Sequence, residues 1–105
     1  MLFHVTATHS DDNCPGYNLE TIPEVLKGLE GREAIAREQS VKIVGMWSAA
    51  PEHTFYMLLD ASNLHDIDQF CTQSAPFKQS YRVTPVITAD ELVDLAKEMM
   101  ARANE

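Results

Sequence analysis

The N-terminal stretch HVTATHSDDNCPGYN holds the densest set of side chains that could do chemistry in this chain. It contains the imidazoles of His4 and His9, the thiol of Cys14 and two neighbouring aspartates between them. Imidazole and thiolate groups bind zinc, copper and nickel, and a thiolate beside a base can act as a nucleophile. The residue types therefore allow a metal site, an activated nucleophile, or a polar loop without either role.

His9 and Cys14 form the candidate metal site, with Asp11 or Asp12 as a third ligand. Their spacing is not that of a zinc finger, and no second cysteine pair supports it. The same residues also fit a loop in which Cys14 packs as a small hydrophobic side chain. We therefore expect no cofactor, and keep zinc, copper or nickel at these two residues as the alternative.

Hydrophobic periodicity assigns the chain to alternating strands and helices. Period-two alternation predicts strands at residues 2–9, 41–49, 54–61 and 81–87, and helical spacing predicts helices at 21–38, 63–74 and from 88 onward. Thr21 with Glu24 and Thr88 with Glu91 have the spacing of capping boxes. Gly28 and Gly31 weaken the first helix, and we expect a kink or a slip near Ile35, where its apolar stripe loses register. The short gap between the second and third strands predicts a hairpin.

The element order βαββαβ with a C-terminal helix predicts an α+β, ferredoxin-like fold over a single domain, residues 1–105. The expected strand order is 4-1-3-2, and Pro85 agrees with an outer fourth strand because proline cannot donate to a sheet. Both inner helices should cover one face of the sheet. That face is assigned the side chains of Phe3, Val5, Phe55, Met57, Leu59 and Val83.

The opposite face of the predicted sheet mixes polar and apolar residues. Strand parity gives it His4, Thr6, Tyr56, Leu58 and Arg82, and the second strand adds Val44 and Met46. Such a face is commonly covered by a partner. The sequence therefore predicts a homodimer through the sheet face.

Two segments, LHDIDQFCTQSAPF at 64–77 and YRVTPVITADELVDLAKE at 81–98, resemble small members of the dimeric α/β-barrel group. These members include muconolactone-isomerase-like proteins and several uncharacterised or metal-binding relatives of about this length. The resemblance implies that two ferredoxin-like protomers pack sheet to sheet. It also implies that small aromatic or lactone substrates bind between the sheets without a cofactor.

The function predicted first is small-molecule binding in a pocket on the sheet face of the homodimer. His4, Tyr56 and Arg82 would hold a small anionic or enolic group there. A second hypothesis is a cofactor-free isomerase or cyclase with His4 as the base, a third is the metal-binding module, and the same residues also fit a plain dimer interface. The remaining residues predicted to contact a ligand are Thr6, Trp47 and His53.

The expected position of each histidine depends on strand direction. With the first and third strands taken as parallel neighbours, His53 is expected beside His4, and His9 with Cys14 at the other end, roughly 16 Å away at about 3.3 Å per residue. This placement predicts that His9, Cys14 and His53 do not share one site. Arg82 is likewise expected far from His4, so the ligand should be elongated, about 10 Å or more.

The composition and net charge of the chain indicate which classes of partner are not expected. The chain has 105 residues, a formal net charge of −8 and eight scattered basic residues. A phosphate backbone or an anionic membrane would be repelled, so nucleic acid and membrane are not expected partners. The start lacks the features of a signal peptide. Two isolated cysteines fit a reducing compartment, and we expect a cytoplasmic protein.

Overall fold

Four strands form one antiparallel sheet in the computed structural model, which describes residues 1–105. Its order is β2-β3-β1-β4, which confirms the predicted 4-1-3-2 arrangement and the outer position of the strand with Pro85. The strands are β1 (Leu2–Thr8), β2 (Lys42–Ala49), β3 (Thr54–Asp60) and β4 (Ser80–Val86).

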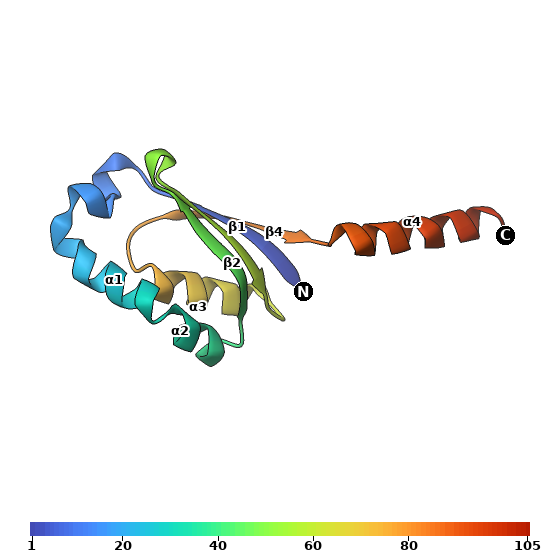
Figure 1. Ribbon diagram of the computed structural model, residues 1–105, viewed down its shortest axis with the longest axis horizontal. Coiled ribbons are helices and arrows are strands. Elements are labelled where there is room, and N and C mark those ends of the chain that lie inside the picture. The colour runs from blue at the N-terminus through green and yellow to red at the C-terminus, as the bar shows by residue number, and fades with distance from the viewer.

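Three helices lie on one face of this sheet, and a fourth projects from it (Figure 1). The three are α1 (Ile22–Glu30), α2 (Arg32–Glu38) and α3 (Leu64–Ser74). The helix breaks between α1 and α2 at Gly31, four residues before the expected position near Ile35, which lies inside α2. The fourth helix is α4 (Ala89–Ala103).

One of the two predicted capping boxes forms. The Thr88 hydroxyl accepts the backbone N–H of Glu91 at 3.1 Å, and the Glu91 side chain caps Thr88 in return. The box predicted at Thr21 is wrong. The chain is already helical there, in a 3-10 turn over Leu19–Thr21, and the Thr21 hydroxyl donates to the carbonyl of Asn18 at 2.7 Å.

The core lies between the sheet and the helices. Val5 and Leu59 of the central strands and Ile67 and Phe70 of α3 are completely buried. Each such side chain contributes about 1.5–3 kcal/mol through removal from water. Gly28 lets α1 approach the end of α3 closely, because a Cβ there would lie 2.6 Å from the backbone oxygen of Ser74. The sheet is therefore a rigid support for residues at its ends.

The pairing of β2 with β3 contains an irregularity that strand parity does not show. The register shifts between Ile43 and Gly45, so Ile43 and Met46 both pack against the core. The prediction that Met46 lies on the opposite, open face is therefore wrong. That face instead receives Trp47, whose ring lies over Gly45.

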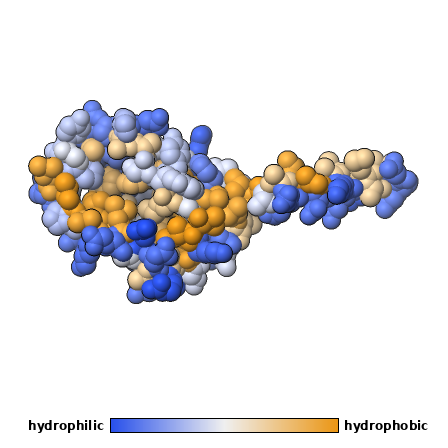
Figure 2. All heavy atoms as spheres, in the orientation of Figure 1, coloured by the Kyte–Doolittle hydropathy of each residue, from blue (hydrophilic) through white to orange (hydrophobic).

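The helix α4 is separate from the rest of the molecule. None of its residues is buried, and the molecule reaches 64 Å along its longest axis. Figure 2 shows an apolar side and a charged side along its length. The exposed apolar residues include Leu92, Val93, Met99 and Met100. None of the helices combines the length and hydrophobicity that crossing a membrane requires.

Candidate metal centre

The direction of β3 brings two regions together that the sequence analysis placed apart. β1 and β3 are antiparallel, and Thr8 pairs with Thr54. The prediction of parallel neighbours is therefore wrong, and His53 lies beside His9 instead of His4. Chain connectivity gives the reason. A helical crossover returns β2 in the direction of β1, and the hairpin then reverses β3 against both.

His9 and His53 are joined through their backbones at this end of the sheet. His9 follows β1 directly, and its N–H donates to the carbonyl of His53 at 3.1 Å. His53 ends the 3-10 turn Ala50–Glu52 with φ 51° and ψ 45°, a left-handed conformation that is uncommon for residues other than glycine. The turn thus determines the position of the His53 backbone, and with it the direction of its Cα–Cβ bond.

Cys14 is held in the loop after β1. The side-chain amide of Asn18 donates to the carbonyl of Cys14 at 2.9 Å and to that of Asp12 at 2.8 Å. Pro15 then starts a further 3-10 turn. These contacts fold the loop back toward the sheet, and Cys14 is half-buried there.

The three side chains of His9, Cys14 and His53 converge. One ligand atom from each lies within 4.8 Å of the other two. Nε2 of His9 is 3.3 Å from Nδ1 of His53. Two imidazole nitrogens on one tetrahedral zinc ion are about 3.3 Å apart, given zinc–nitrogen bonds of about 2.0–2.1 Å. The histidine pair therefore already has the spacing of two ligands of one ion.

Asp11 orients the second histidine. The Nε2 of His53 lies 2.9 Å from Oδ1 of Asp11. A proton on Nε2 leaves the lone pair of Nδ1 directed at the cluster, as in the carboxylate–histidine–metal arrangement of many metal sites. Asp11, which the sequence analysis considered as a ligand, is thus placed to support a ligand.

His9 lies in an environment that keeps its imidazole neutral. Burial lowers its pKa, the neighbouring His53 lowers it further, and interactions with Gln79 and Asp11 oppose these effects. His9 Nδ1 and the side-chain oxygen of Gln79 are both buried without a hydrogen-bond partner. The sequence analysis missed Gln79, because no pattern distinguishes a glutamine just before a strand.

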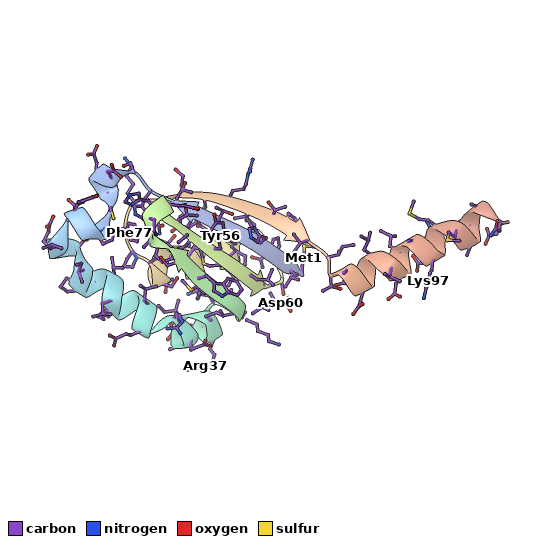
Figure 3. All side chains as sticks on the ribbon, turned by 45° about the horizontal axis from the view of Figure 1, so that its top comes forward. Met1, Arg37, Tyr56, Asp60, Phe77 and Lys97 are labelled. Carbon is purple, nitrogen blue, oxygen red and sulfur yellow. The ribbon has the colours of Figure 1, made fainter.

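A hollow of about 150 Å³ adjoins the cluster. The ring of Phe77 lies edge-on to His9, with centroids 5.0 Å apart. Phe77 is labelled in Figure 3 at the end of the sheet opposite Met1 and Asp60. The residues lining the hollow are His9, Cys14, Pro15, Ser48, Ala50, His53, Thr54, Phe55 and Phe77.

Five of the six residues predicted for the sheet-face pocket lie on one face, and His53 does not. Thr6 pairs with Tyr56 on one side and with Arg82 on the other, and the rings of His4 and Tyr56 are 6.3 Å apart. Arg82 is therefore beside the middle of β1, and the prediction that it lies far from His4 is wrong. Trp47 pairs with Tyr56 from β2.

These residues of the open face do not converge on a cavity within one chain. No cavity is lined by His4, Thr6 or Arg82. The Tyr56 hydroxyl donates to Glu52 at 3.1 Å, and this bond raises the pKa of Tyr56. The sixth predicted contact residue, His53, belongs to the other cluster.

The architecture is that of a ferredoxin-like α+β protein, and it is similar to a crystal structure of muconolactone isomerase with a TM-score of 0.53. The similarity covers 84% of this chain and 90% of that chain at 18% identity, so it shows the fold. It confirms the resemblance at this level. Residues 1–100 match the family described as Domain of unknown function (DUF3303), and the chain belongs to that family. No curated protein matches it significantly.

Proposed function

We propose that this protein binds a transition-metal ion through Nε2 of His9, Sγ of Cys14 and Nδ1 of His53. The convergence of these three atoms within 4.8 Å supports the proposal. Two imidazoles and one thiolate suit zinc or copper, with nickel as the third candidate. Zinc is the ion to test first, because the histidine spacing matches its tetrahedral geometry.

Proton positions also favour a bound ion. If the Nε2–H of His53 donates a hydrogen bond to Asp11, Nδ1 of His53 is an acceptor and the Nε2–H of His9 must donate to it. His9 Nδ1 then carries no proton and is buried without a partner. An ion that takes both facing lone pairs would move the His9 proton to Nδ1. There it could be donated to the unpartnered oxygen of Gln79. A metal would thus satisfy two buried groups that now lack partners.

The test is metal binding by protein without a histidine tag. We expect one zinc per chain by calorimetry and elemental analysis, and loss of at least about a hundredfold in affinity in His53→Ala. His4→Ala is the matched control, because His4 is an exposed histidine of the same sheet, and it should retain zinc. Equal affinity in wild type and His53→Ala, for zinc, copper and nickel alike, would contradict the proposal.

A second proposed function is small-molecule binding between the open sheet faces of a homodimer. The half-buried Tyr56 and Leu58 and the exposed Trp47 on this face support it, as does the apolar side of α4. Arg82 would hold a small anionic ligand through paired hydrogen bonds. His4 would be the base if the dimer acts as an isomerase or cyclase.

Assembly is tested by light scattering. We expect a dimer in wild type and a monomer in Leu58→Asp, because the interface would bury an unpaired charge. Thr72→Asp, an exposed change on α3, should leave the dimer intact. Thermal shift with small carboxylates should show stabilisation that Arg82→Ala loses. A monomeric wild type would contradict this second proposal. A cytoplasmic location, also proposed, would keep Cys14 reduced.

A further inference from the structure

We propose that the metal at His9, Cys14 and His53 keeps its fourth coordination position open and binds a small monocarboxylate there. The inference rests on the proposed metal site and adds the class of ligand that the site takes. A site with three protein ligands and one open position exchanges small molecules, whereas a site closed by four protein ligands does not.

The first support is the number of ligands. The group of possible metal-ligating side chains contains His9, Cys14 and His53 and no fourth member. The carboxylate of Asp11 is engaged by Nε2 of His53, the nitrogen that faces away from the cluster. The chain therefore supplies three donors to an ion that prefers four.

The second support is the hollow beside those donors. Its volume of about 150 Å³ is well above the roughly 10–15 Å³ that one water molecule needs. Phe55 and Phe77 give it an apolar wall, and Ser48 is a hydroxyl-bearing residue of its lining. The hollow thus has room for a ligand of a few heavy atoms with an apolar end.

The charge of the site selects an anion. A divalent ion with one thiolate and two neutral imidazoles retains one positive charge at its open position. Asp11 lies on the other side of His53, and the wall of the hollow contains no carboxylate that would repel an anion. A carboxylate would neutralise the ion with one oxygen and could accept a hydrogen bond from Ser48 with the other. A short alkyl group would then lie against the phenylalanine rings.

Cobalt(II) provides the readout, because its visible absorption reports coordination number and ligand exchange. The full-length protein is loaded with cobalt and titrated with acetate, propionate and benzoate. We expect saturable spectral shifts with acetate and propionate and at least tenfold weaker binding of benzoate. Ala50→Leu enlarges a side chain that lines the hollow and leaves the three ligand side chains and the Ala50 carbonyl in place, so it should keep cobalt and lose the shifts. Ala34→Leu, an exposed change on α2, is the control.

Each outcome has one interpretation. Cobalt binding with thiolate absorption but no response to any carboxylate would overturn the open position and leave the proposed metal site standing. An unchanged response in Ala50→Leu would place the carboxylate elsewhere and overturn the inference. Failure to bind cobalt, zinc, copper or nickel would overturn the metal site and this inference together.

Discussion

Two regions of the sheet carry histidines, and they differ in how their side chains are directed. At the end of β1, His9 and His53 approach to 3.3 Å and have Asp11 and Gln79 beside them. On the open face, His4 lies 6.3 Å from the ring of Tyr56, whose hydroxyl is directed to Glu52. Residue types suited to chemistry are present in both regions.

The difference shows that residues on one face of a sheet do not by themselves form a binding site. A site requires side chains that converge on the same place. Side chains on one sheet face stand roughly perpendicular to it and parallel to one another, so a partner must cover them before a site forms. A loop and a turn at a strand end can instead direct their side chains inward. This contrast predicts four effects of decreasing size.

Acidification should separate the two regions most strongly. Zinc affinity should fall by about a hundredfold or more over two pH units below neutrality, because protons compete for the imidazoles and for Cys14. Carboxylate binding by Arg82 should change little over this range, because guanidinium stays charged. Calorimetry at several pH values measures both. Zinc affinity independent of pH would exclude these ligands.

The support from Asp11 gives the next largest effect. Asp11→Asn should weaken zinc binding by about 10–100-fold, because a neutral amide holds His53 less firmly. Asp12→Asn is the matched control, one residue further along and without a contact to either histidine, and it should bind like wild type. Competition with a chromogenic chelator measures the three affinities. Similar losses from both changes would indicate only a general effect of negative charge.

A smaller effect is expected from Gln79. Gln79→Leu should weaken zinc binding several-fold, because His9 would lose the acceptor for its Nδ1 proton while keeping its own position. Gln73→Leu, at an exposed position of α3, serves as the control in the same competition assay. Wild-type affinity in Gln79→Leu would show that the buried Gln79 oxygen does not support the site.

The smallest effect concerns the metal-free protein. Because burial lowers the pKa of His9 in the folded state, the unfolded chain binds protons more readily. The free energy of unfolding is therefore highest above the ordinary histidine pKa of 6.5, where His9 is neutral in both states. It decreases as the pH falls below 6.5, because the unfolded chain takes up the proton first. The melting temperature should drop by a few degrees on acidification, less so in His9→Gln. His4→Gln should keep the wild-type drop.

The secondary structure and sheet order could be predicted because they depend on local patterns. Alternation, proline position and capping residues determine them, and Pro85 and Thr88 behave as predicted. The direction of β3 was also available from connectivity, and applying it would have placed His53 beside His9. The bulge before Gly45 and the orientation of Gln79 depend on packing between distant segments. No local pattern records such packing.

The left-handed backbone of His53 has a consequence for selection experiments. Glycine adopts this conformation without the penalty of about 1–2 kcal/mol that a side chain brings. In metal-free medium, a library screened for heat resistance should therefore favour glycine at position 53. In medium containing zinc, binding to the native state would stabilise the histidine form by mass action. The preferred residue at one position would thus report whether the folded protein holds an ion.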